Sequence, residues 1–246
     1  MLLFVRREGN ELKRYAHLGT GNYHRKNSLI YTDYSLLTAD ETLCADVHKV
    51  FQQITGMGKK IHPNLLIHAP FNLKKSLLKM IAEEAQAAIE GKDAHIIAKL
   101  NALTDPEMIR ALYEASNAGV KIDLIVRGMC CLRPGIEGVS ENIRVVSIIG
   151  RFLEHSRVYY FKNSDQQLFC SSADWMERNL SNRIEVCFPI LKKKHQSRIL
   201  AEINWYLEDE AQCWELGADG EYTKIHPVET EGLTQGVQQK LLEKLS

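Results

Sequence analysis

The sequence predicts an α/β fold in which a mixed sheet is flanked by helices. Between residues 95 and 126, two apolar runs of strand length enclose a stretch with helical spacing, and this order favours parallel pairing of the two strands. A hairpin of two apolar runs near residues 158–174 is the second observation, and a similar hairpin over residues 1–23 is the third. Hairpin strands pair antiparallel, so the sheet is expected to contain both kinds of pairing.

The composition indicates an ordinary globular protein of one or two domains. The chain has 246 residues, of which 45% are hydrophobic and 25% are charged. Lys and Arg together number 31, the same as Asp and Glu, so the chain lacks the bulk positive charge typical of nucleic-acid-binding proteins. No nucleic-acid partner is therefore expected, and any anion site must be local.

Nothing in the sequence indicates export or membrane insertion. No apolar run approaches the roughly 18 residues that cross a bilayer, and no signal peptide is recognisable. The six cysteines show no C-x-x-C spacing, which indicates reduced thiols and argues against a zinc site. We therefore expect a cytoplasmic protein without a transmembrane segment; a peripheral position at the inner face of the membrane is the alternative.

The N-terminal part of the chain is expected to hold a hairpin, a loop and a helix. Residues 8–11 form the turn of the hairpin at 1–23, and residues 24–39 lack periodicity and are expected to be a loop. A helix begins near Asp40, presents an apolar face at helical spacing and ends at a pair of glycines. Residues 59–63 are the expected boundary between two parts of the chain.

The remaining chain alternates between strand and helix patterns. Asp105 is expected to cap a helix whose first residue is Pro106. The expected strands cover residues 65–67, 95–100, 121–126, 143–149, 158–161, 168–172 and 183–190. The expected helices cover residues 73–90, 106–119 and 193–208, with a further short helix at 234–245.

One stretch combines groups that suit a phosphate ligand. His155 and Arg157 are two residues apart at the start of a strand, so their side chains share a face. The hairpin returns the chain so that Ser171, Ser172 and Asp174 end near them. An imidazole, a guanidinium and small hydroxyl donors around one point can bind phosphate oxygens and supply a nucleophile or an acid.

The N-terminal hairpin repeats this pattern. Thr20 and Asn22 stand where Ser172 and Asp174 stand in the second copy, and two copies of such a hairpin imply two similar halves with a site between them. The histidine and arginine of the second copy precede its first strand, whereas the strand of the first copy begins at Met1. We therefore expect the chain to be a fragment whose first histidine motif lies upstream.

Residues at strand ends indicate further anion contacts. Ligands bind beyond the C-terminal ends of parallel strands, which places Lys99, Asn101 and Arg127 favourably. On the residues alone, Arg127 is as consistent with a structural pairing to a carboxylate as with a phosphate contact. Arg178 follows the second hairpin and is within reach of the same site. A basic run on the helix expected at 73–90 more often forms a solvated face than a polyanion contact, and it consists of Lys74, Lys75 and Lys79.

The duplicated arrangement of an H-x-R motif, a strand pair and a turn of small polar residues resembles the phospholipase D-like fold. Several segments also resemble, in order, the C-terminal half of the bacterial polyphosphate kinases, a family that phosphorylates itself on histidine. These segments are residues 15–23, 29–33, 36–40, 126–130, 140–144, 153–155 and 172–176. The resemblance extends from residue 1 to about residue 225.

The resemblance implies a phospholipase D-like mixed sheet with one complete C-terminal half and a partial first half. Residues 1–58 would be the C-terminal remnant of the first catalytic domain, residues 59–225 the second domain, and residues 226–246 a helical or flexible tail. The implied enzyme reversibly transfers the terminal phosphate of ATP to polyphosphate through a phosphohistidine. Its ligands would be ATP/ADP and inorganic polyphosphate, with Mg²⁺ bound mostly outside this chain, and the full-length enzyme would be a homo-oligomer.

The resemblance and the residue pattern together imply roles for individual residues. His155 would act as an acid or base or contact phosphate, and His17 would support catalysis. The residues expected to bind nucleotide or phosphate are Tyr31, Arg127, His155, Arg157, Ser172 and Arg178, and no metal ligand is assigned. The phosphorylated histidine would lie upstream, so this fragment alone is expected to be inactive.

Two other functions stay open. A phospholipase D-like phosphodiesterase or nuclease would hydrolyse a phosphodiester through its histidine pair, and a non-catalytic domain would bind polyphosphate or oligomerise without turnover. Arg157 stands where the phospholipase pattern has lysine, and Asp174 where it usually has asparagine. Both positions resemble the polyphosphate kinases more closely, so the kinase is the first hypothesis and the phosphodiesterase the second.

Overall fold

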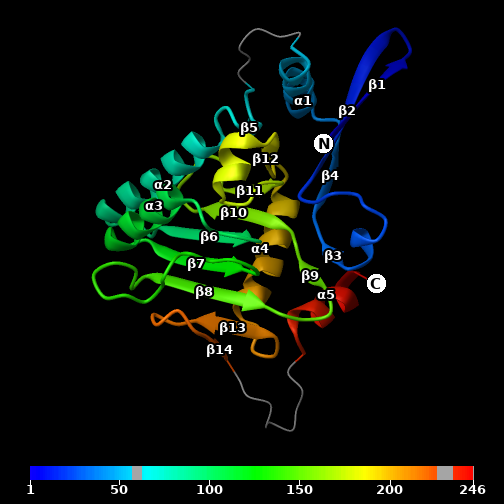
Figure 1. The fold of residues 1–246 in the computed structure, drawn as a ribbon. Helices are drawn as coiled ribbons and strands as arrows, with labels where there is room; N and C mark the ends of the chain where they lie inside the picture. Colours follow the sequence, from blue (N-terminus) through cyan, green and yellow to red (C-terminus); the bar gives the residue numbers. More distant parts are fainter. Residues whose placement is uncertain (57–62, 226–234, 246) are drawn as a thin grey trace.

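A computed structural model describes residues 1–56, 63–225 and 235–245 of the chain. Within these residues, nine strands form one sheet in the order β14-β13-β8-β7-β6-β10-β11-β12-β5 (Figure 1). Their bounds are β5 Ile67–Ala69, β6 His95–Leu100, β7 Lys121–Val126, β8 Ile143–Ile148, β10 Arg157–Phe161, β11 Leu168–Ser171, β12 Glu185–Pro189, β13 Cys213–Leu216 and β14 Tyr222–Lys224. The predicted α/β fold with a mixed sheet flanked by helices is confirmed.

The centre of the sheet is parallel and the strands on either side are antiparallel. β6, β7 and β8 run parallel, with His95 opposite Lys121. The crossover that parallel pairing requires is supplied between β6 and β7 by α3 (Pro106–Asn117). β10 lies antiparallel to β6 and is joined to β11 by the expected hairpin, in which Arg157 is opposite Ser171.

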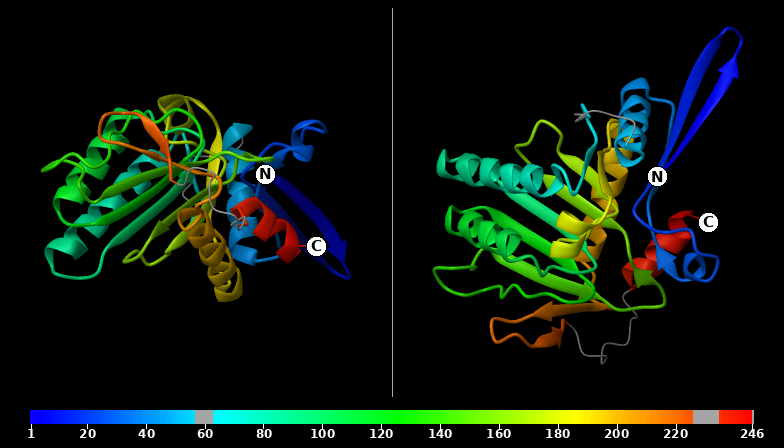
Figure 2. Two further views of the ribbon diagram at one scale, coloured as in Figure 1. Left: turned by 90° about the horizontal axis from the view of Figure 1, so that it is seen from below. Right: turned by 45° about the horizontal axis from the view of Figure 1, so that its top comes forward.

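Helices cover both faces of this sheet (Figures 1 and 2). α2 (Leu73–Ile89) and α3 pack on one face, and α4 (Lys193–Leu207) packs on the other. Successive residues of β6 alternate between the two layers, because Ile96 belongs to the core beneath α2 and α3 whereas Ile97 belongs to the core on the side of α4. A C-terminal helix, α5 (Val237–Leu245), contacts α4.

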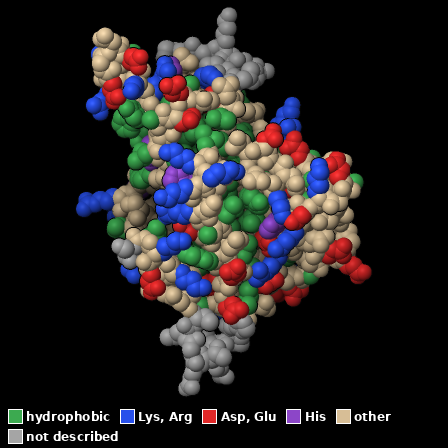
Figure 3. Space-filling model, turned by 180° about the vertical axis from the view of Figure 1, so that it is seen from behind, with side chains coloured by type: hydrophobic (Ala, Val, Ile, Leu, Met, Phe, Trp, Pro, Cys, Tyr) green, Lys and Arg blue, Asp and Glu red, His purple; other side chains and the backbone are tan. Residues whose placement is uncertain are grey.

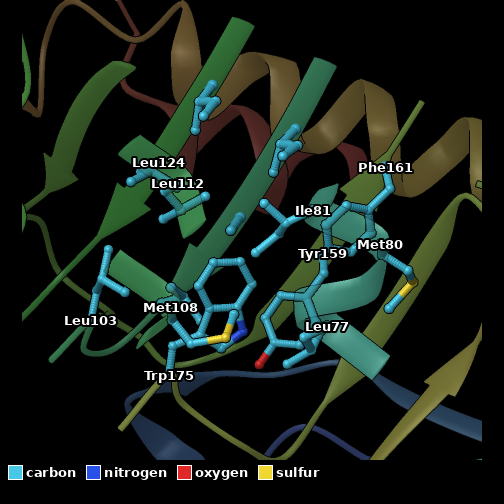
Figure 4. Close-up of a cluster of buried hydrophobic side chains, with 14 of the residues drawn as sticks. Leu77, Met80, Ile81, Leu103, Met108, Leu112, Leu124, Tyr159, Phe161 and Trp175 are labelled. Atoms are coloured by element: carbon cyan, nitrogen blue, oxygen red, sulfur yellow. The ribbon is translucent and has the colours of Figure 1, made fainter. Parts of the chain in front are cut away.

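The core beneath α2 and α3 is built around two aromatic side chains (Figure 4). The rings of Tyr159 and Trp175 have centroids 5.3 Å apart, and both residues are fully buried. Leu77 of α2 and Met108 of α3 pack into the same cluster. At the start of α3, Asp105 accepts hydrogen bonds from two backbone N–H groups of the first turn at 3.1 Å each, so the predicted cap is confirmed.

The N-terminal part forms a smaller sheet of three described strands, β1 (Leu2–Glu8), β2 (Glu11–Gly19) and β4 (Ser35–Thr38). The hairpin of β1 and β2 extends away from the rest of the molecule (Figure 1). β4 leads into α1 (Glu41–Ile54), where Asp40 caps the helix through a backbone N–H of its first turn. The expected hairpin and the expected helix are both confirmed.

The expected loop at residues 24–39 is wrong. Besides β4 and a 3₁₀ turn, η1 (Asn27–Leu29), it contains β3 (Tyr31–Thr32), which pairs in parallel with β9 (Leu153–Glu154). The partner of β3 lies far along the chain, so no local pattern marked it. The strand expected at 65–67 lies two residues later, and the expected boundary at 59–63 falls mostly outside the described residues.

The two hairpins belong to one repeated arrangement. β1, β2 and β4 are followed by α1, and β10, β11 and β12 are followed by α4. The backbone N–H of Thr20 donates to the carbonyl of Tyr34 at 3.0 Å, and that of Ser172 donates to the carbonyl of Val186 at 2.9 Å. Thr20 and Ser172 therefore occupy equivalent positions in the two copies.

Candidate functional site

The residues around His155 lie where the N-terminal part of the chain meets the large sheet. β3 and β9 form a short parallel ladder in which Thr32 is opposite Glu154. The residues that follow this ladder are Asp33 and His155, and Nδ1 of His155 lies 3.0 Å from both carboxylate oxygens of Asp33. Two segments far apart in the sequence thus bring a carboxylate to a histidine.

The contacts of Asp33 determine how the ring of His155 is used. A carboxylate only accepts hydrogen bonds, so Nδ1 carries a proton when it faces Asp33, and in the neutral ring the lone pair is then on Nε2. The hydroxyl of Thr20 donates to the same carboxylate at 2.6 Å, which ties Asp33 to the first hairpin. A histidine oriented in this way can give or take a proton at Nε2.

The setting of His155 is aromatic and only slightly open. The ring of Tyr31 lies beside it with centroids 4.7 Å apart and an angle of 43° between the planes. The side chain of His155 is 13% exposed. A ligand can therefore reach the imidazole, but most of the ring is held by protein groups.

The guanidinium of Arg157 is held inside the protein. Nε and Nη2 donate to the two carboxylate oxygens of Asp174 at 3.2 and 2.9 Å, a bidentate pair. Nη1 donates to the backbone oxygen of Thr20 at 2.9 Å. It also lies 3.3 and 3.1 Å from the two ring nitrogens of His155, and these nearly equal distances place it over the ring face rather than in line with one lone pair. Arg157 therefore joins the two parts of the chain beside His155.

Asp174 is ionised in this setting. Burial alone would raise its pKa, but the hydrogen bonds and charge of Arg157 lower the pKa below its ordinary value. The backbone N–H of Asn101, 2.7 Å from Oδ1, acts in the same direction, and the backbone N–H of Ala102 lies 3.3 Å from the same oxygen. The carboxylate thereby connects the end of β6 to the hairpin.

Arg127 lies at the end of β7, as expected. Its Nε and Nη2 donate to the side-chain oxygen of Asn101 at 3.3 and 3.1 Å, and no carboxylate pairs with it among the described residues. The guanidinium is half-buried, and among the described residues no hydrogen bond involves its Nη1. Gly128 comes next in the chain, and any larger residue there would clash, because a Cβ would lie 2.7 Å from the carbonyl oxygen of Asn101.

Ser172 holds a carboxylate. Its hydroxyl donates to Oε2 of Glu185 at 2.5 Å and accepts from the backbone N–H of Val186 at 3.1 Å. Thr20 makes the same two contacts in the first copy, with Asp33 and Tyr34, and in both copies the hydroxyl and carboxylate are 13 residues apart. Glu185 is therefore the second copy's counterpart of Asp33.

The other expected residues lie elsewhere. His17 sits on β2, where its Nε2 is 2.9 Å from the hydroxyl of Tyr23, and burial lowers its pKa. Arg178 is exposed at the start of a π-helical turn, η2 (Arg178–Asn182). Lys99 is 1% exposed and bonded to Glu154 and Ser156, so the structure does not leave it free to bind phosphate as its place at a strand end had indicated.

Asp33 and Glu185 were not identified from the sequence. The signal that would have found them is the equal spacing of hydroxyl and carboxylate in the two copies. The similarity that is recognisable in the sequence covers only the two hairpins, and the carboxylates lie beyond them.

Two family models match the chain. One, described as polyphosphate kinase C-terminal domain 1, matches residues 1–60, and the other, polyphosphate kinase C-terminal domain 2, matches residues 66–235. The chain belongs to the polyphosphate kinase family. The expected resemblance is thereby confirmed.

Several polyphosphate kinases are similar to the whole chain. Those of Pseudomonas aeruginosa and Xylella fastidiosa are 60% and 53% identical over 247 residues, covering 100% of this chain but only 36% and 35% of theirs. The crystal structure of polyphosphate kinase from Porphyromonas gingivalis superposes with a TM-score of 0.89 at 33% identity, covering 99% of this chain and 37% of that one. The chain thus spans about a third of the length of the polyphosphate kinases it matches.

The described part of the chain contains no ready-made cluster of metal ligands. Within it, no group of three or more His, Cys, Asp or Glu side chains is arranged to hold one. Mg²⁺ is commonly bound by one or two carboxylates together with substrate phosphates, but the carboxylate of Asp33 already accepts hydrogen bonds from His155 and Thr20. In the same residues, no helix is both long and apolar enough to cross a membrane.

Proposed function

We propose that this chain is the C-terminal part of an enzyme that reversibly transfers the terminal phosphate of ATP to polyphosphate through a phosphohistidine. The observation that carries the proposal is the pairing of His155 with Asp33 across the two copies of the repeat, beside Arg157, in a chain of the polyphosphate kinase family. The enzyme would work in the cytoplasm, where ATP is available, and as a homo-oligomer.

His155 is assigned as the acid or base of the transfer. Nε2 carries the lone pair that can accept a proton, and Asp33 stabilises the ring when it becomes positively charged. Arg157 and Ser172 have their main contacts inside the protein, so we assign them to holding the site rather than to direct phosphate binding. His17 supports the first hairpin through Tyr23.

Three residues are proposed to contact the nucleotide or its phosphates. Tyr31 lies against His155, and its aromatic ring is placed to stack on the adenine base of the nucleotide. Arg127 has its Nη1 available at the end of β7, and the N–H groups of a guanidinium suit phosphate oxygens. Arg178 is exposed and charged at the start of η2.

The nucleophilic histidine is proposed to belong to the first copy of the repeat, in the part of longer family members that precedes the matched segment. Glu185 would orient it, because Glu185 is the counterpart of Asp33, which orients His155.

The chemistry then has two displacements at phosphorus. A neutral imidazole nitrogen attacks the γ-phosphorus of ATP in line, the bond to the β,γ-bridging oxygen breaks, and ADP leaves. The terminal oxygen of a polyphosphate chain next attacks the phosphohistidine and releases the imidazole. His155 gives or takes the proton at the leaving or attacking oxygen, and Arg127 neutralises charge on the transferred group. Mg²⁺ would enter with ATP as part of the substrate.

The test is a hybrid enzyme in which this chain replaces the matched segment of the Pseudomonas aeruginosa polyphosphate kinase. We would incubate it with ATP and Mg²⁺ and measure acid-labile phosphate on the protein and polyphosphate formed. The hybrid should make polyphosphate, and His155→Ala should lower the rate at least about a hundredfold. The 246-residue chain alone should make none.

Two results would overturn the proposal. One is a folded hybrid that neither carries acid-labile phosphate nor makes polymer. The other is a hybrid that hydrolyses bis(p-nitrophenyl) phosphate in a reaction that depends on His155, which would establish the phosphodiesterase instead. Salt-dependent polyphosphate binding without turnover in the hybrid would indicate the non-catalytic domain.

A further inference from the structure

A buried carboxylate stands directly before His155. The side chain of Glu154 is 1% exposed, and it lies on β9, in the rung of the ladder next to the Asp33–His155 pair. A buried charge is retained only when other groups compensate it fully. The groups that compensate Glu154 show which parts of the molecule hold the histidine.

Four side chains from four elements converge on this carboxylate. Oε2 lies 3.0 Å from Nζ of Lys99 on β6, and it accepts hydrogen bonds at 2.8 Å from Thr32 on β3 and from Tyr206 on α4. Oε1 accepts from Nε2 of Gln238 on α5 at 2.7 Å. Burial alone would raise the pKa of Glu154, but the charge of Lys99 and the hydrogen bonds from Gln238, Lys99 and Tyr206 lower it, so the carboxylate is ionised.

The C-terminal helix reaches this network through one amide. In addition to its hydrogen bond with Glu154, the side chain of Gln238 donates to the carbonyl of Phe152 at 2.9 Å and accepts from the N–H of Phe152 at 2.9 Å. A Cβ on Gly150 would lie 2.5 Å from Oε1 of Gln238, so the approach is close. Gln238 is itself 4% exposed. The amide is thus hydrogen-bonded to the backbone segment that leads into β9.

The network connects Glu154 to both strands that carry Asp33 and His155. The hydroxyl of Thr32 donates to Glu154 at 2.8 Å and lies 3.3 Å from the backbone N–H of His155. Thr32 and Glu154 are the residues immediately before Asp33 and His155, respectively, on the two paired strands. A shift of Glu154 therefore moves the two partners relative to each other.

We propose that Glu154 is a positioning residue for His155, and that the C-terminal helix α5 completes its setting through Gln238. The inference rests on the proposed function for its effect on catalysis, but its structural part concerns this chain alone. Helix α5 thereby gains a role in the site, although it contributes no group that touches a substrate.

The test uses two variants that approach Glu154 from different elements. Gln238→Met keeps the volume of the side chain but removes three hydrogen bonds, and Tyr206→Phe removes one hydroxyl from α4. Both keep the Lys99–Glu154 ion pair, whereas Glu154→Gln would leave a buried lysine unpaired and endanger folding. The matched control is Gln239→Ala, because Gln239 is exposed on the same helix.

The first readout is the protonation of the His155 ring in the chain itself, without substrate. At about pH 8, where free imidazole is neutral, ¹⁵N NMR distinguishes a proton on Nδ1 from a proton on Nε2. The parent chain and Gln239→Ala should show His155 protonated on Nδ1. Gln238→Met and Tyr206→Phe should shift His155 toward a mixture of both forms.

The second readout is activity in the hybrid enzyme. Gln238→Met should lower kcat for polyphosphate synthesis about tenfold or more and leave KM for ATP within about twofold, because Gln238 does not touch the nucleotide. Gln239→Ala should change neither constant. Unchanged ring signals in both folded variants would overturn the inference. Altered ring signals in a chain whose hybrid never makes polyphosphate would overturn the proposed function and leave the positioning role intact.

Discussion

The contact between Asp33 and His155 leads to a prediction that does not depend on the hydrogen-bond network around Glu154. Asp33→Asn keeps the shape of the side chain but gives it an N–H group that can face Nδ1, which favours the wrong ring tautomer. We expect the hybrid enzyme to lose about 10²–10⁴-fold in its rate of polyphosphate synthesis, with a melting temperature lower by no more than a few degrees. A rate within about threefold of the parent would show that Asp33 is not needed to orient the ring.

Asp174 gives a prediction about pH. Burial alone would raise its pKa, but Arg157 and the backbone N–H of Asn101 hold the pKa below the ordinary value. The folded-state pKa is below the unfolded value of about 3.9, so the stabilisation is complete above about pH 4 and is lost as the pH falls through the folded-state pKa.

Urea unfolding of the chain at pH 6 and pH 3 measures this effect. The free energy of unfolding should be lower at pH 3, and Asp174→Asn should reduce the difference between the two pH values. The variant should also be less stable at pH 6, because Arg157 loses its buried partner. An equal difference in the parent and the variant would exclude Asp174 as a source of the acid sensitivity.

At the scale of elements, α2 is held against the sheet by its buried apolar side chains. Leu77 lies in the core beneath this helix and is 0% exposed. Leu77→Ala should lower the free energy of unfolding by about 2–5 kcal/mol, because it removes buried methyl groups and leaves a cavity. Lys75→Ala, on the exposed side of the same helix, should change it by about 0.5 kcal/mol or less. Urea titrations compare the two, and equal effects would contradict the assigned faces.

Two basic runs differ in their availability to polyphosphate. On α2, Nζ of Lys74 lies 3.0 Å from Asp105, which caps α3, and 2.9 Å from Glu107 of α3. Lys79 lies 2.8 Å from Glu83. The run at the start of α4 is exposed and makes no ion pair among the described residues, and it consists of Lys192, Lys193 and Lys194. Basic side chains gather on the back of the molecule, shown in Figure 3, and α4 lies behind the sheet in Figure 1.

Replacing Lys192, Lys193 and Lys194 by alanine should weaken polyphosphate binding by the chain about tenfold at low salt and reduce its salt dependence. Alanine at Lys74, Lys75 and Lys79 is the matched control and should have a smaller effect, since carboxylates already compensate two of these charges. Titration of a fluorescent polyphosphate at several salt concentrations measures both sets. A larger effect from α2 would contradict this ranking.

At the scale of the whole molecule, stability should be uneven. The strands β6, β7 and β10 lie at the centre of the large sheet, whereas the hairpin of β1 and β2 extends outward with Phe4 and Leu12 exposed. Amide hydrogen exchange followed by mass spectrometry should therefore be slowest in the central strands and fastest around residues 6–14. Equal protection of the hairpin and the central strands would show that the hairpin is stabilised by contacts beyond those seen here.

Much of the fold was predictable because it depends on local patterns. The helices α1, α2, α3 and α4 follow from apolar spacing and from capping residues such as Asp40 and Asp105, and β6 and β7 are continuous apolar runs. The elements that were missed, such as β3 and β9, are short and obtain their hydrogen bonds from each other. Without a periodic pattern of their own, they could not be identified locally.

The sequence by itself determined the fold class, the family, the repeated hairpin and the importance of His155, because residue types and spacing carry that information. Only the tertiary structure decided which groups surround His155. Asp33 reaches it through a parallel pairing of distant strands, Arg157 is committed to Asp174, Lys99 is committed to Glu154, and Gln238 comes from the C-terminal helix. These partners depend on register and on buried charges finding compensation, and both are settled only when distant segments pack together.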